Sequence, residues 1–113
     1  SVLLALMGSG LSGQNFAFHG YLPAKNELRQ KKLRELEKDS RQEKRTQIFI
    51  ETPYRNMQML ETLIDTCAPN TKICVATDLT LASESIMTRT TSGWRRQGLP
   101  SIDRRPTVFL LQS

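Results

Sequence analysis

Several residue types that mark particular classes of protein are scarce in this chain. Its 113 residues include two cysteines, one histidine and one tryptophan, and they contain no apolar run of 18 or more residues. The two cysteines, Cys67 and Cys74, are too few for a disulfide framework, so we expect buried free thiols and a reducing, cytoplasmic setting. No His and Cys cluster has metal-ligand spacing, so we expect no bound metal. Without a long apolar run, we expect no transmembrane helix and no membrane partner.

Charge is absent from one region and concentrated in another. Residues 1–24 contain no Asp, Glu, Lys or Arg, whereas residues 25–45 hold nine basic and five acidic residues. Residues 46–113 hold seven basic and six acidic residues, so the net charge of +5 lies almost entirely on the middle segment. Such a segment is either a solvated helix with ion pairs four residues apart or a face that contacts phosphates.

The spacing of apolar residues predicts alternating helices and strands. We expect helices or helical turns over residues 2–9, 25–40, 53–67 and 92–97, and strands over residues 16–20, 47–51, 72–77, 83–90 and 107–111. Strands cluster toward the C-terminal end, which predicts an α/β fold with a mixed sheet of about five strands and helices packed on it. A chain of this length suits a single domain.

The junction between residues 47–51 and the following helix carries polar side chains where ligands commonly bind. Thr52 and Pro53 are typical of a helix start. They place Glu51, Tyr54 and Arg55 at the end of a strand, which is the ligand-binding edge of open α/β sheets. Glu51 and Arg55 either pair with each other or a partner domain, or they order an active-site edge where Arg55 meets a phosphate.

Two other patterns have structural explanations. Gly8, Gly10 and Gly13 spell a G-x-G-x-x-G motif, but here it follows a helix and precedes a strand, the reverse of a dinucleotide-binding loop. We therefore interpret it as a helix C-cap and loop. His19 has no acidic or cysteine partner nearby in the sequence, so we expect it to be packed in a strand rather than to act as a base.

Candidate nucleic-acid contacts form two groups. The first is the basic helix, with Lys25, Arg29, Lys31 and Lys32. The second is the run Trp94–Arg95–Arg96, in which an aromatic ring and two cations could hold an unpaired base and its phosphates. Alternatively, Trp94 packs on the sheet and its neighbouring arginines are solvated, which is the interpretation we favour.

Four segments together resemble a known family. They are Ser9–Gly10–Leu11, Phe16 to Lys25, Phe49 to Arg55 and Thr77 to Leu81, and they occur in the family's order. The chain resembles the C-terminal half of the tetrapyrrole methylase superfamily, and most of all the ribosomal small-subunit methyltransferase I family. It departs from that family at Tyr54, where the family has histidine, and at Thr77 and Leu81, where it has cations.

The resemblance implies the C-terminal domain of an S-adenosylmethionine-dependent methyltransferase that acts on a ribose 2′-hydroxyl of ribosomal RNA. It implies that an N-terminal domain is absent from these 113 residues, that this chain alone is inactive, and that the full protein is a homodimer. The cofactor would lie between the two halves, and the catalytic base is unknown. The implied cofactor contacts are Leu6, Met7, Tyr21, Leu22, Pro106 and Thr107. The RNA contacts would be Lys25, Arg29, Lys31, Lys32, Arg55, Arg95 and Arg96.

Two alternatives remain open at this point. The full protein could methylate a tetrapyrrole or another small molecule, although the basic helix argues against a small substrate. It could also be a non-catalytic RNA-binding domain. A glycine-rich cofactor loop upstream of Ser1 would favour an enzyme over a binding module.

Overall fold

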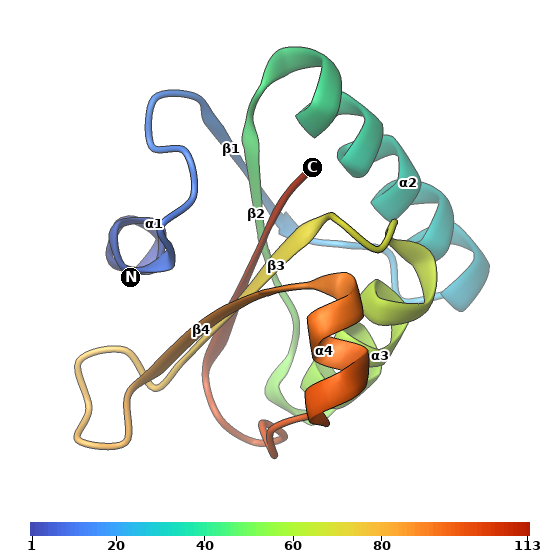
Figure 1. Ribbon diagram of the computed structural model, residues 1–113. Coiled ribbons are helices and arrows are strands. Elements are labelled where there is room, and N and C mark those ends of the chain that lie inside the picture. The colour runs from blue at the N-terminus through green and yellow to red at the C-terminus, as the bar shows by residue number, and fades with distance from the viewer.

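The computed structural model describes residues 1–113 as one mixed sheet with helices on both faces (Figure 1). The helices are α1 (Val2–Ser9), α2 (Asn26–Glu43), the 3₁₀ turn η1 (Pro53–Arg55), α3 (Asn56–Thr66) and α4 (Thr91–Gln97). The strands are β1 (Phe16–Tyr21), β2 (Thr46–Ile50), β3 (Lys72–Thr77), β4 (Ser85–Thr90) and β5 (Thr107–Gln112). The predicted α/β class and five-stranded mixed sheet are confirmed.

The sheet has the strand order β1-β2-β5-β3-β4. Strands β1 and β2 are parallel, and every other neighbouring pair is antiparallel. The last strand of the chain, β5, therefore lies in the centre of the sheet, where both of its edges are paired. Its apolar sequence suits this place, because a central strand is covered on both faces.

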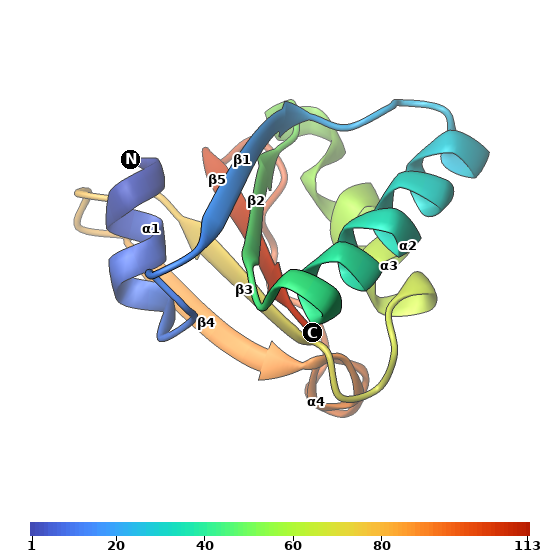
Figure 2. The same ribbon diagram turned by 90° about the horizontal axis from the view of Figure 1, so that it is seen from above.

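The two faces of the sheet carry separate apolar cores. Ile73 and Val75 point to the face covered by α2, α3 and α4, whereas Cys74 and Ala76 point to the face where α1 lies (Figure 2). This alternation along β3 agrees with the prediction. The first core is larger, and Phe49 and Phe109 stack in it with ring centroids 5.9 Å apart.

The face that carries α1 is only partly covered. Helix α1 is the single helix on this side, and strand β1 lies at the sheet edge beyond it (Figure 2). Large apolar side chains of α1 and β1 are exposed to solvent. They are Leu3, Leu4, Met7, Phe16, Phe18 and Tyr21. We call this set the α1 face.

Helix α2 extends three residues beyond its predicted end, to Glu43, and two boundaries near the ends of β2 and β3 also differ from the prediction. A 3₁₀ turn, which is common at the start of a helix, occupies residues 53–55, and α3 begins at Asn56, whose buried side chain donates hydrogen bonds to the loop before β5. Strand β4 begins at Ser85 rather than residue 83. The preceding residues form hydrogen-bonded turns in which Asp78 and Thr80 have positive φ.

The predictions for the glycine motif and for the two cysteines agree with the structure. Gly10 ends α1 with a φ of 75°, which is the left-handed conformation that glycine adopts most easily, so the glycine motif is a helix cap. Cys67 and Cys74 are free and buried in different cores. Burial raises the pKa of Cys67 to about 12, so its thiol is unreactive at neutral pH. No helix combines the length and apolar character needed to cross a membrane.

Candidate functional site

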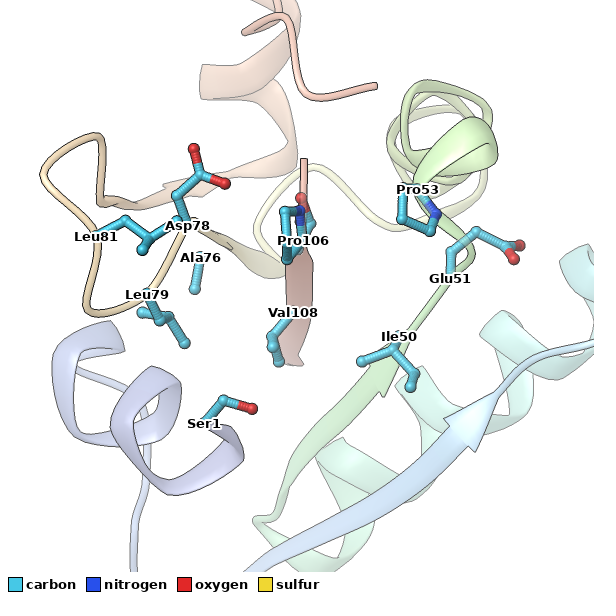
Figure 3. A pocket seen from close by; sticks show the side chains of 11 residues that line it. Ser1, Ile50, Glu51, Pro53, Ala76, Asp78, Leu79, Leu81, Pro106 and Val108 are labelled. Atoms are coloured by element: carbon cyan, nitrogen blue, oxygen red, sulfur yellow. The ribbon is translucent and has the colours of Figure 1, made fainter. Parts of the chain in front are cut away.

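A cavity of about 300 Å³ opens on the α1 side of the sheet, where β2 and β3 end and β5 begins. This is the strand edge at which the sequence predicted a ligand site. Ile50, Ala76, Leu79 and Val108 form its apolar walls (Figure 3). The other lining residues are Ser1, Glu51, Pro53, Asp78, Leu81, Pro106 and Thr107. Cavities of this size with apolar walls and few polar groups are typical of small-molecule sites.

Glu51 contributes a carboxylate at one end of this cavity, but that carboxylate is already paired. Arg29 of α2 donates to Glu51 Oε2, and both side chains are almost completely buried. The other carboxylate oxygen accepts the Thr52 backbone N–H at 2.7 Å. Arg29 Nε also donates to the Pro23 carbonyl at 3.0 Å. The pair therefore joins the β1–α2 loop to the end of β2 and directs Glu51 toward α2, away from the apolar walls (Figure 3).

Asp78 stands at the opposite end and is also paired. Arg105 Nε donates to its Oδ2 at 2.8 Å, and Ser83 Oγ donates to the same atom at 2.9 Å. Hydrogen bonds from Arg105 and then Ser83 lower the pKa of Asp78 below its usual value of 3.8. The ionised carboxylate therefore stabilises the fold above that value, and its contribution is lost as the pH falls through the lowered pKa.

The two carboxylates thus order the rim of the cavity rather than act as free bases. Each accepts hydrogen bonds from a guanidinium group and from one further donor. A general base must reach the proton that it removes; both oxygens of Glu51 are hydrogen-bonded, and Asp78 is held through Oδ2 by Arg105 and Ser83. His19 is not a base there either, since its Nε2 lies 2.7 Å from Gln47 Oε1 within the sheet.

The predicted cofactor contacts are dispersed in this structure. Pro106 and Thr107 line the cavity. Leu6 is buried beneath α1, and Met7 and Tyr21 are exposed on the α1 face. Leu22 packs into the core on the opposite side of the sheet from this cavity. The backbone turns toward the other face after Gly20, which sequence spacing did not reveal.

The predicted RNA contacts on α2 and at its N-cap are at least partly exposed, except for Arg29. Lys25 and Lys31 are exposed and Lys32 is half-buried, so all three can reach a phosphate. Arg29 is 2% exposed and bound to Glu51, so the prediction that it contacts phosphate was wrong. Glu51 pairs with Arg29, so a pair with Arg55, one of the alternatives left open by the sequence, is not formed.

The other predicted cations lie apart from α2. Trp94 is buried with its indole N–H bonded to the Ile73 carbonyl, as the favoured interpretation predicts. Arg95 and Arg96 are exposed on α4, but Arg95 also donates to the Ile64 carbonyl at 2.6 Å and is not simply solvated. Helix α3 packs against both α2 and α4, and its acidic residues Glu61 and Asp65 line the grooves on both sides. The basic residues of α2 and α4 therefore do not form one continuous patch.

Three residues that organise the cavity rim were not predicted from the sequence. Asn56 Nδ2 donates to the carbonyls of Ile102 and Arg105, and Arg105 in turn binds Asp78. The only available signal was the resemblance to the small-subunit methyltransferase I pattern, in which Asp78 occupies an acidic position. Nothing in the spacing of Asn56 and Arg105 indicated that they meet.

Comparisons with known proteins identify relatives of this sequence. Ribosomal RNA small subunit methyltransferase I of Vibrio cholerae is 38% identical over 86 residues, 76% of this chain. The protein of the same name from Haemophilus influenzae is 32% identical over 111 residues, 98% of this chain. The chain is homologous to these methyltransferases. It spans 28% and 38% of their respective lengths, and no protein-family model matches the sequence.

Solved structures share the fold of this chain. The methyltransferase CobJ superposes with a TM-score of 0.63 at 21% identity, over 100% of this chain and 47% of CobJ. Uroporphyrin-III C-methyltransferase from Thermus thermophilus, solved with S-adenosyl homocysteine, has a TM-score of 0.52 at 14% identity, over 98% of this chain and 48% of that one. The chain therefore has the fold of part of a tetrapyrrole methylase.

Proposed function

We propose that the chain forms the C-terminal half of an S-adenosylmethionine-dependent methyltransferase that modifies ribosomal RNA on a ribose 2′-hydroxyl. The observation that carries this proposal is the 38% identity with ribosomal RNA small subunit methyltransferase I. The neighbours of known structure share only the fold, and the chain matches just under half of each of them. A second half would cover the partly open α1 face.

The cavity at the end of β2, β3 and β5 suits part of the cofactor. Its walls Ile50, Leu79 and Val108 are apolar, which fits the flat face of a purine ring, and Pro106 and Thr107 border it. When bound, S-adenosylmethionine supplies an activated methyl group on sulfur. The residues of this chain would bind and orient it and exclude water, and catalysis would rely mainly on the positioning of the reacting groups.

The partners follow from the same proposal. Lys25, Lys31 and Lys32 would hold RNA phosphates. This argues against a small tetrapyrrole substrate, because such a substrate gains little from cations outside its cleft. Apolar residues of the α1 face would pack against the other half of the protein or against a second copy in a homodimer. A ribosomal substrate implies a cytoplasmic location.

Filling the cavity is expected to abolish tight cofactor binding by the full-length protein. Leu79→Trp places an indole among the apolar walls and leaves less room for a ligand, so the affinity of this variant for S-adenosylmethionine should fall about tenfold or more, a loss of about 1.4 kcal/mol or more. Leu99→Trp, on a different exposed loop, is the matched control and should bind normally. Isothermal titration calorimetry measures both. Equal affinities for the two variants would show that the cofactor does not bind in this cavity.

A further inference from the structure

Tyr54 is a large aromatic side chain that the fold leaves in solvent at the edge of the cavity. It is 74% exposed, and it follows Pro53, which forms part of the cavity lining. Exposed single apolar residues are common and need no explanation by themselves. The surroundings of Tyr54 are less ordinary, because a cation from a distant part of the chain lies on its ring.

Arg104 places its guanidinium over Tyr54, with the guanidinium carbon 5.8 Å from the ring centroid. This distance is within the range of cation–π attraction. Arg104 belongs to the loop before β5, 50 positions further along the sequence, so the contact depends on the fold. An aromatic ring has two faces, and the high exposure of Tyr54 leaves the face opposite Arg104 open.

The backbone around Arg104 is held in an unfavourable conformation. Its φ is 66°, in the left-handed region that residues other than glycine rarely adopt. The Arg104 N–H donates to the Pro53 carbonyl at 2.9 Å, and Asn56 Nδ2 donates to the carbonyls of Ile102 and Arg105 at 3.1 and 2.7 Å. Such strain persists only where the surrounding structure enforces it, and it is concentrated at functional sites.

We infer that Tyr54 and Arg104 form a binding site for an unpaired nucleotide of RNA beside the cofactor cavity. A base stacks on the open face of Tyr54, and Arg104 with the neighbouring exposed Arg55 binds the adjoining phosphates. Base-paired RNA does not fit, since its bases have no free face to stack. This inference rests on the proposed function, because it identifies how the RNA substrate is held next to the methyl donor.

Removing the ring tests the stacking. With a mixed-sequence, single-stranded RNA of about ten nucleotides, Tyr54→Ala in the full-length protein should lower the affinity about tenfold or more, as removal of one base–aromatic stack predicts. Tyr54→Phe keeps the ring and should bind as the unaltered protein does. An oligonucleotide of the same length without bases should bind both variants equally. A uniform reduction on both oligonucleotides, or no reduction on either, would overturn the inference.

Arg104→Gly separates a binding role from a structural one. Glycine accepts a φ of 66° without strain, so the midpoint of urea unfolding should be unchanged or higher, whereas RNA affinity should fall. A lower midpoint with unchanged RNA affinity would make Arg104 a structural residue and contradict the inference.

Cofactor titration distinguishes this inference from the function on which it rests. All three variants should bind S-adenosylmethionine as the unaltered protein does. If the unaltered protein binds no S-adenosylmethionine, the proposed function fails. If it binds the cofactor and Tyr54→Ala still binds the RNA normally, only the nucleotide site fails.

Discussion

Replacing Arg29 or Glu51 with alanine is expected to lower the free energy of unfolding by about 3–5 kcal/mol, as breaking one side of a buried ion pair typically does. Both side chains are almost completely buried and they contact each other. Either single substitution leaves a charged group without its partner in a place that water cannot reach. Such a decrease is a large fraction of the stability of a typical domain, about 5–15 kcal/mol. Urea unfolding, followed by circular dichroism, measures it.

Two further variants make this test specific. Arg29→Met combined with Glu51→Leu removes both charges, so it should cost less than the sum of the single substitutions. Arg45→Ala breaks contacts to Asp39 and Glu43 at 3.5 Å that are partly exposed, and it should cost about 1 kcal/mol or less. If Arg29→Ala cost no more than Arg45→Ala, the Arg29–Glu51 pair would not hold the two loops together.

Reversing three charges on α2 is expected to change RNA binding more than any substitution elsewhere on the surface. Lys25, Lys31 and Lys32, each changed to glutamate, would no longer bind phosphates. The slope of log affinity against log salt concentration should flatten by about 0.7–0.9 for each phosphate that is released. Arg29 is left unchanged, because it is buried and its removal would destabilise the fold. Fluorescence anisotropy with labelled small-subunit ribosomal RNA at several salt concentrations gives the slope.

A control with equal charge distinguishes local binding from a general effect of net charge. Changing Lys38, Arg41 and Lys72 to glutamate alters the net charge by the same amount at exposed positions outside the proposed RNA-binding set. It should reduce affinity less and leave the slope closer to that of the unaltered protein. If the two triple variants had the same slope, the effect would be one of net charge, and Lys25, Lys31 and Lys32 would not form a local phosphate-binding site.

The elements of this fold were predictable because apolar spacing directly reports burial. Residues 72–77 alternate because β3 lies between two cores, and residues 107–111 are mostly apolar because β5 is central. The boundaries at Pro53 and Ser85 were missed because they depend on contacts with distant segments. Asn56 is bound by the loop before β5, and the turns after Asp78 have backbone angles that no sequence pattern indicated.

The site was less predictable for a similar reason. Sequence patterns placed Glu51 at a ligand-binding edge, and a cavity lies there, but the alternatives that they left open for Glu51 did not include Arg29. Glu51 pairs with Arg29, which is 22 positions earlier, and Arg104 reaches Tyr54 from 50 positions later. Such pairings arise from the crossing of loops in the folded chain. The charge of Arg29 gave no indication that it would be buried.

The most direct test of the proposed function is methyl transfer by the full-length protein. Incubated with S-adenosylmethionine carrying a labelled methyl group, it should label small-subunit ribosomal RNA. The label should appear in a nucleotide pair that resists alkaline cleavage, because methylation of a 2′-hydroxyl blocks that cleavage. Label in a tetrapyrrole, or no label in RNA despite tight cofactor binding, would contradict the account.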